Sequence, residues 1–202
     1  MAKLLVLFHS FYGTTFKMAE EVAKGAASTG GVVTVKQVPE LISSEALAAS
    51  GALEAKKKFS HVPTATIDEL VEYDGIAIGT GTRFGNMSST MRSFWDQTGK
   101  LWASGALIGK AGTVFGSTGT GGGHETTIVS TWFTLAHHGM VIVPLGYRDP
   151  SLRQADEVHG GSPYGASAIQ KGTGSRPSAK ELGLAFSQGA AWALVAHQGA
   201  KR

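Results

Sequence analysis

The chain has 202 residues, of which 42% are hydrophobic and 16% charged, and its formal net charge is +3. This length predicts one domain with a sizeable core, and no apolar run reaches the roughly 18 residues that a membrane span needs. The chain has no cysteine, which excludes disulfides, thiol catalysis and cysteine-bound metals. Its basic residues form no concentrated stripe, so no nucleic-acid partner is expected. Because no signal-peptide pattern opens the sequence, we expect a cytoplasmic protein.

The first predicted strand ends in a loop rich in hydroxyl groups. The apolar run Leu4–Phe8 suits a strand buried on both faces, and apolar residues recur at helical spacing from Phe16 onward. Between them lies Ser10–Thr15, whose hydroxyls, single glycine and adjoining helix N-terminus predict an anion site. The loop has no lysine or arginine and does not match a P-loop, so it suits a phosphate monoester. The alternative interpretation is an ordinary turn in which a serine or threonine caps the helix.

Two more strands are predicted in the next part of the chain, separated by a long irregular segment. The β-branched run Val32–Val38 predicts the second strand. Residues 39–65 show no clear period and are interpreted as an insertion or long loop with one helical turn. Thr66–Glu69 has the pattern of a capping box before a short helix. Gly75–Gly79 predicts the third strand, which opens onto residues 80–87, rich in glycine and hydroxyls.

The last third of the chain repeats this alternation. Ala111–Phe115 predicts a fourth strand and Met140–Val143 a fifth. Thr126–His138 is rich in β-branched residues, but its length and its C-terminal histidines before a glycine favour a helix. Residues 144–177 are interpreted as a second insertion without regular structure. Ser178–Glu181 has the pattern of a capping box that begins a last helix.

The alternation of strands and helices predicts an α/β fold: a doubly wound, five-stranded parallel sheet with helices on both faces. In the strand order 2-1-3-4-5, the first, third and fourth strands are neighbours. Their loops, Ser10–Thr15, 80–87 and Ser117–Glu125, would then converge at the carboxyl edge of the sheet, where such folds bind ligands. No Gly-x-Gly-x-x-Gly follows the first strand, which disfavours a dinucleotide. One phosphate site with two flanking loops favours a mononucleotide such as FMN.

Six stretches of the sequence carry a family resemblance. They are Ser10–Thr15, Gly79–Ser88, Leu101–Leu107, Ser117–Gly123, Leu135–Pro144 and Gly160–Ala166. Together they resemble the WrbA family of flavodoxin-like, FMN-dependent NAD(P)H:quinone oxidoreductases, and the similarity runs essentially end to end. The resemblance implies a single flavodoxin-like domain over residues 1–202, with insertions at about 39–65 and 144–177. It also implies bound FMN, NAD(P)H as electron donor, quinone as substrate and a homotetramer.

The resemblance further implies roles for individual residues. The cofactor-binding residues would be Ser10, Phe11, Tyr12, Gly13, Thr14, Thr15, Thr82, Arg83, Phe84, Ser117, Thr118, Gly119, Thr120, Gly121, Gly122 and His137. The first six of these would hold the phosphate, and the others would flank the ring and ribityl chain. His137 and Arg83 would be catalytic, stabilising negative charge on the reduced flavin or the developing hydroquinone. Tyr12 would contact the nicotinamide cofactor, and Trp102 would line the quinone site in a pocket shared between subunits.

Two residues depart from the family pattern. Gly81 stands where the family usually has proline, which predicts a looser loop beside the ring. Thr14 replaces a common histidine, which would alter the entrance to the pocket. Neither departure removes a phosphate ligand.

Alternatives remain for both the residues and the function. Trp102 would also suit an anchor at a subunit interface, and His137 a helix C-terminus favoured by the dipole. His124 and Glu125 have no further ligands at metal-site spacing, so no metal is expected. A flavodoxin-type electron carrier is one rival function, although such carriers usually dock through acidic surfaces and this chain is +3. An FMN-binding interaction protein is the other rival.

Overall fold

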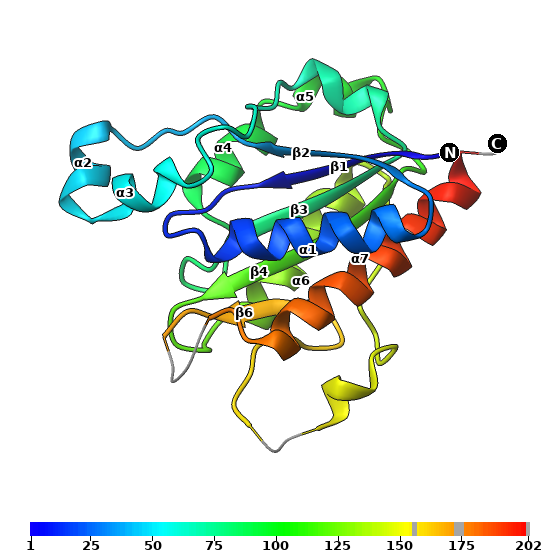
Figure 1. The fold of residues 1–202 in the computed structure, drawn as a ribbon. Helices are drawn as coiled ribbons and strands as arrows, with labels where there is room; N and C mark the ends of the chain where they lie inside the picture. The colour runs from blue at the N-terminus through cyan, green and yellow to red at the C-terminus, as the bar shows by residue number, and fades with distance from the viewer. Residues whose placement is uncertain (155–156, 172–175, 201–202) are drawn as a thin grey trace.

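A parallel β-sheet with the strand order β2-β1-β3-β4-β5 forms the centre of the molecule (Figure 1). The computed structural model describes residues 1–154, 157–171 and 176–200. The five strands are β1 (Lys3–Phe8), β2 (Val32–Gln37), β3 (Gly75–Gly81), β4 (Ala111–Thr118) and β5 (Val141–Ile142). All neighbouring pairs run parallel. The predicted fold class and strand order are therefore confirmed.

A sixth short strand, β6 (Ser167–Ile169), pairs in parallel with the carboxyl end of β4. It adjoins Gly116–Thr118, whereas β5 pairs only with Ala111 and Gly112 at the other end of β4. The outer edge of β4 is thus shared by two strands from different parts of the chain. The sequence predicts no strand within residues 144–177, because the three residues of β6 include one large apolar side chain and give no strand period.

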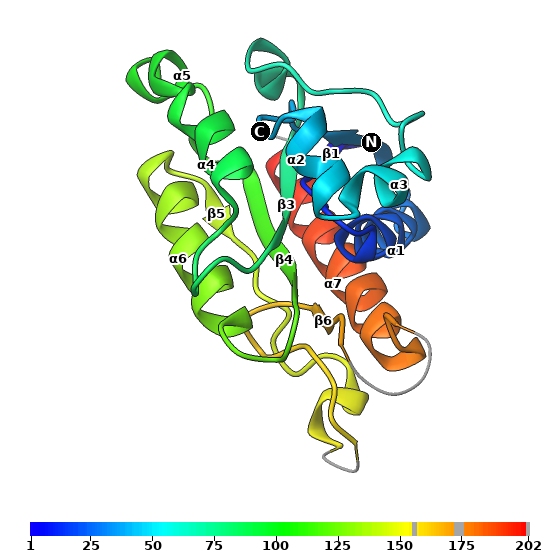
Figure 2. The same cartoon turned by 90° about the vertical axis from the view of Figure 1, so that its left-hand side faces the viewer.

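Helices cover both faces of the sheet, as Figure 2 shows in the view along its edge. On one face lie α1 (Thr14–Ser28) and α7 (Ala179–Gly199), and on the other lie α4 (Ser89–Asp96), α5 (Gly99–Ala103) and α6 (His124–His137). Side chains of β1 alternate between these layers, as a pleated strand requires. Leu4, Val6 and Phe8 pack toward α1 and α7, whereas Leu5 and Leu7 pack toward α4 and α6. The prediction of a strand buried on both faces is therefore confirmed.

Helices α1 and α7 cross in close contact because glycines stand at the crossing. A Cβ atom placed on Gly189 would lie 2.0 Å from the carbonyl oxygen of Val22, and one on Gly25 would lie 2.0 Å from that of Phe186. These separations are far below van der Waals contact, so neither position accepts a side chain without moving a backbone. The crossing fixes α1, and with it the loop at the helix N-terminus.

The two predicted insertions hold short regular elements. Residues 39–65 contain α2 (Ser44–Ala49) and α3 (Ala52–Lys57), so one predicted helical turn is in fact two short helices. Residues 66–74 contain the 3-10 helix η1 (Asp68–Glu72), and the second insertion contains η2 (Pro150–Arg153) besides β6. Part of the second insertion, residues 155–156 and 172–175, lies outside the described residues. Within the described ranges, no helix combines the length and apolarity needed to cross a bilayer.

Of the two predicted capping boxes, one is complete in the structure. At α7, Ser178 and Glu181 form the complete reciprocal box. At Thr66, the carboxylate of Glu69 accepts from the backbone N–H, but the threonine hydroxyl does not cap η1 in return. The segment predicted as a helix at Thr126–His138 is confirmed as α6, which begins two residues earlier at His124.

Candidate functional site

The loop after β1 presents an uncapped helix N-terminus. Gly13 adopts the left-handed conformation at φ +88°, which favours glycine, and no side chain caps α1. The Ser10 hydroxyl instead accepts a hydrogen bond from the backbone N–H of Gly13 at 3.0 Å. The first N–H groups of a 15-residue helix therefore stay available to a ligand. This geometry favours the anion-site interpretation of the loop over a simple capped turn.

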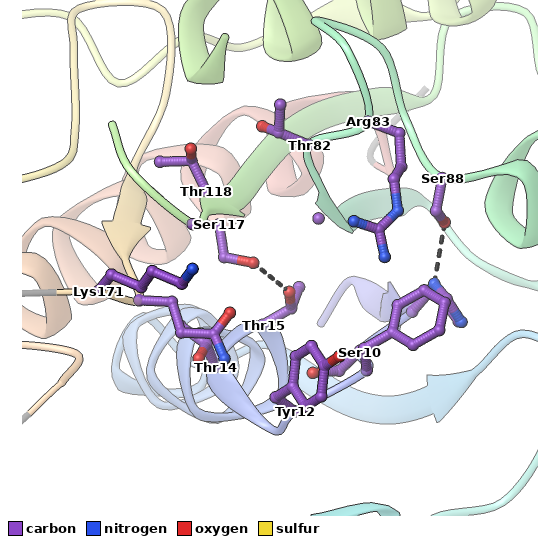
Figure 3. Close-up of a pocket in the computed structure, with 15 residues that line it drawn as sticks. Ser10, Tyr12, Thr14, Thr15, Thr82, Arg83, Ser88, Ser117, Thr118 and Lys171 are labelled. Carbon is purple, nitrogen blue, oxygen red and sulfur yellow. Dashed lines mark hydrogen bonds between the residues drawn. The ribbon is translucent and has the colours of Figure 1, made fainter. Parts of the chain in front are cut away.

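The carboxyl ends of β1, β3, β4 and β6 and the residues that follow them meet around one cavity of about 400 Å³ (Figure 3). It is lined by His9, Ser10, Phe11, Tyr12, Thr14, Thr15, Gly81, Thr82, Arg83, Ser88, Ser117, Thr118, Gly119, Gln170 and Lys171. The predicted convergence of the loops after β1, β3 and β4 is therefore borne out by the geometry. At its centre the hydroxyl of Thr15, in the first turn of α1, and that of Ser117, near the end of β4, lie 2.8 Å apart and hydrogen-bond. Hydroxyl and backbone N–H donors make this end of the cavity suitable for a phosphate.

The loop after β3 holds an arginine over an aromatic ring. Arg83 and Asn86 exchange two backbone hydrogen bonds, which closes a tight turn through Phe84 and Gly85. The Arg83 guanidinium carbon lies 4.7 Å from the centroid of the Phe11 ring, within cation–π range. Phe84, at φ +51°, is fully exposed on the outside of the turn and does not line the main cavity. Gly81 ends β3 and pairs with Ser117, and the expected looseness of this loop stays a prediction.

The glycine-rich loop after β4 forms a second, more open hollow beside the first. Thr118 closes the loop, donating from its hydroxyl to the carbonyl of Gly122 and accepting from the N–H of Gly121. Gly121 has φ +96°, which this tight closure requires. Phe84, Thr120 and Gly122 line the hollow, which shares Thr82, Thr118 and Gly119 with the main cavity. The two hollows thus form one continuous region, which is bordered by most of the residues expected to flank a flavin ring in the loops after β3 and β4.

A buried histidine network forms one wall of the cavity. His9 is 2% exposed; its Nδ1 lies 2.9 Å from the hydroxyl of Ser88, and its Nε2 lies 3.1 Å from a carboxylate oxygen of Glu40. Lys56 also contacts this carboxylate, at 2.6 Å. Burial lowers the pKa of His9. Burial raises the pKa of Glu40, but hydrogen bonds from His9 and Lys56 outweigh it and hold that pKa well below its usual range.

Five residues that line the cavity were not among the predicted site residues: His9, Gly81, Ser88, Gln170 and Lys171. His9 stands directly before Ser10, and this position is the one signal in the sequence that could have marked it. Ser88 is the N-cap of α4. Gln170 and Lys171 lie just after β6, and no sequence pattern marked them.

His137 and Trp102 do not line the main cavity and lie in a different part of the fold. They line a hollow of about 590 Å³ between α4, α5 and α6, together with Phe133. Trp102 is 60% exposed and Phe133 64%. The 14 residues of α6 separate its N-terminus, near the glycine-rich loop, from His137 at its far end, a span of roughly 20 Å. Within one chain these two residues therefore do not join the main cavity, and their roles stay predictions.

The fold and the site together define a flavodoxin-type protein. The flavodoxin family model matches residues 6–128, more than half of the chain, so the chain belongs to the flavodoxin family. A WrbA-like flavodoxin from Agrobacterium tumefaciens is similar at 25% identity and a TM-score of 0.66, with 98% of this chain and 99% of that chain covered. An archaeal flavodoxin is 24% identical, with a TM-score of 0.60 and the same coverage. Flavodoxin 2 from Bacillus cereus shares the fold at 16% identity, a TM-score of 0.59 and the same coverage.

Family membership implies that the cavity binds FMN, and its donor groups fit that ligand. The uncapped α1 N-terminus and the hydroxyls of Ser10, Thr14 and Thr15 suit a phosphate monoester. Phe11 and Tyr12 supply aromatic surface at the same cavity. Among the described residues, no cluster of three or more histidine, aspartate or glutamate side chains is arranged to hold a metal.

Proposed function

We propose that the chain is a cytoplasmic, homotetrameric NAD(P)H:quinone oxidoreductase that uses FMN to reduce quinones by two electrons. The observation that carries the proposal is one cavity that joins a phosphate loop to an arginine and two aromatic residues at its mouth. The full-length similarity to a WrbA-like protein at 25% identity supports the same function. Bound FMN would accept a hydride from NAD(P)H and deliver two electrons to the quinone.

The residues of the phosphate end would bind and orient the cofactor. Ser10, Thr14 and Thr15 would donate to the phosphate together with the amides of the first turn of α1. The Thr15–Ser117 hydrogen bond ties the first turn of α1 to the carboxyl end of β4. Because α1 follows the phosphate loop and β4 precedes the glycine-rich loop, the bond would hold these two parts of the cavity at a fixed separation.

The residues at the mouth would bind the flat substrates and balance charge. Tyr12 is 45% exposed and is available to contact the nicotinamide cofactor. The Arg83 guanidinium, held over Phe11, would stabilise negative charge that develops at the ring or on the leaving hydroquinone. Trp102 and His137 would reach the quinone site from a neighbouring subunit, since one chain keeps them away from its own cavity.

Steady-state kinetics test this proposal. We expect NADH or NADPH to reduce benzoquinone with turnover far above free FMN, and double-reciprocal lines for the two substrates to run parallel. Arg83→Gln is expected to lower kcat about tenfold, the size of one lost charged hydrogen bond. Lys24→Gln, on the exposed side of α1, serves as a control for loss of a positive charge. Absence of turnover from a protein that holds FMN would contradict the proposal.

The family match to flavodoxins favours one alternative, an electron carrier. A carrier would pass electrons singly to a protein partner and would reduce quinones no faster than free FMN. A redox titration separates the two functions: the oxidoreductase is expected to take up both electrons at nearly one potential, and the carrier at two well-separated potentials.

A further inference from the structure

A lysine, Lys171, lines the cavity, although the phosphate loop itself contains no cationic residue. Residues 10–15 include no lysine or arginine. Two cationic side chains line the cavity, counting the described residues alone: Arg83, stacked on Phe11 at the mouth, and Lys171. Figure 3 shows the Lys171 amino group directed toward Ser117 and Thr118, on the side where Thr14 and Thr15 lie.

The backbone of Lys171 is fixed, although its side chain is exposed. Its N–H donates to the carbonyl of Gly119 at 2.9 Å, and the N–H of Gln170 donates to that of Thr118 at 2.7 Å. These bonds continue the pairing of β6 with β4. The amine on its flexible stem therefore starts from a set position beside the cavity wall.

Hydroxyls and amides leave the charge of a phosphate monoester only partly balanced. A monoester carries between −1.5 and −2 charges near pH 7, whereas a helix N-terminus supplies about half a positive charge. Lys17, the nearest lysine on α1, donates to the carbonyl of Arg176 and does not line the cavity. The Lys171 amine makes no hydrogen bond or ion pair within the described residues, so it is available to a ligand.

From this arrangement we infer that Lys171 binds the phosphate group of FMN and selects the phosphorylated flavin over riboflavin. The inference rests on the proposed use of FMN. Lys171 closes the side of the phosphate site opposite α1 and supplies a point charge where the loop supplies neutral donors. The cavity therefore distinguishes flavins by charge as well as by shape.

Flavin titrations of the apoprotein test the inference without measuring turnover. FMN and riboflavin are titrated separately against the wild type, Lys171→Met and the control Lys24→Met, with flavin fluorescence as the signal. We expect Lys171→Met to raise the Kd for FMN about tenfold and to leave the Kd for riboflavin unchanged, because one charge-assisted hydrogen bond is lost. Lys171→Arg is expected to retain most of the affinity, and Lys24→Met all of it.

Two further readouts separate binding of the phosphate from a structural effect. The FMN affinity of the wild type should fall more steeply between 50 and 500 mM NaCl than that of Lys171→Met, since an exposed charge pair is screened by salt. The ³¹P resonance of bound FMN should keep its dianionic position to lower pH in the wild type than in the variant.

Three outcomes would overturn the inference. Equal weakening of FMN and riboflavin would assign Lys171 to the fold or the ring. Unchanged FMN affinity with a raised KM for NADPH would assign it to the nucleotide substrate, and the proposed function would stand. A wild-type protein that binds neither flavin would remove the proposed function together with the inference.

Discussion

The phosphate loop and the α4–α6 face were both expected to serve one site, yet only the first is complete within a single chain. Thr15 is 2% exposed and is hydrogen-bonded to Ser117 at the carboxyl end of β4. Trp102 and Phe133, on the other face, are about two-thirds exposed and line an open hollow. A strand, loop and helix encode a binding site through their own backbone, whereas exposed aromatic residues indicate contact with another molecule.

The largest effect on this comparison is expected from the crossing that supports the phosphate side. Gly189→Ala places a Cβ 2.0 Å from the Val22 carbonyl oxygen and should destabilise the fold by about 3 kcal/mol. Gly183 lies on the same helix, and a Cβ added there would have no atom within 4 Å. Gly183→Ala should therefore stabilise the fold by about 0.5 kcal/mol. Urea unfolding measures both. Similar losses for the two variants would show that the crossing does not limit stability.

A smaller but more local effect is expected inside the cavity. Thr15→Val keeps the side-chain shape but removes the hydroxyl, so Ser117 loses its partner and the phosphate loses a donor. FMN binding should weaken by about 2 kcal/mol, roughly 30-fold, and riboflavin binding by much less. Thr134→Val, which lines the other hollow, is the control and should change the Kd for FMN less than about twofold. Loss of FMN binding in both variants would contradict the prediction that FMN binding depends on the phosphate side of the molecule and not on the α4–α6 hollow.

Substitutions on the exposed α4–α6 face should weaken subunit association without changing FMN affinity. Trp102→Ala and Phe133→Ser should each weaken subunit association by about 2 kcal/mol and shift a tetramer toward smaller species in analytical ultracentrifugation. FMN affinity should stay within about twofold of the wild type, while the KM for quinone rises. Variants that remain tetrameric, with unchanged kinetics, would show that this face has neither role.

The smallest expected effect concerns pH. Burial lowers the pKa of His9 below 6.5, so the unfolded chain takes up a proton before the folded chain does. The stability from His9 is therefore complete above about pH 6.5 and declines as the pH falls below it. His124 and His138, whose pKa values burial also lowers, add to the same decline. His9→Asn should make the loss of unfolding free energy between pH 8 and pH 5.5 smaller than in the wild type. An unchanged loss would contradict this role.

The sequence was sufficient for features that one stretch of chain encodes alone. The apolar run Leu4–Phe8 and the hydroxyls and glycine of Ser10–Thr15 predicted both the strand and the ligand loop, because a single backbone segment forms them. The contacts of His9 could not be predicted in this way, since Glu40 and Lys56 reach it from a segment far along the chain. Such contacts follow from tertiary packing and leave no periodic pattern in the sequence.

Dependence on tertiary packing also explains why neither β6 nor the position of Lys171 was predicted from the sequence. Ser167–Ile169 becomes a strand only because the edge of β4 is open beside it, and the N–H of Ile169 is held by the buried carboxylate of Glu181. Lys171 reaches the cavity as a consequence. Conversely, the positions of Trp102 and His137 in one chain could not be foreseen from a resemblance that combines residues of several subunits.

The attachment of β6 to β4 has a consequence for biosynthesis. The phosphate loop, Ser10–Thr15, is synthesised before β3 and β4, whereas Gln170 and Lys171, which also line the cavity, are synthesised after them. Glu181, which holds β6, follows later still. A nascent chain therefore cannot enclose its flavin until Gln170 and Lys171 have emerged, and termination before residue 170 yields a product with an incomplete pocket.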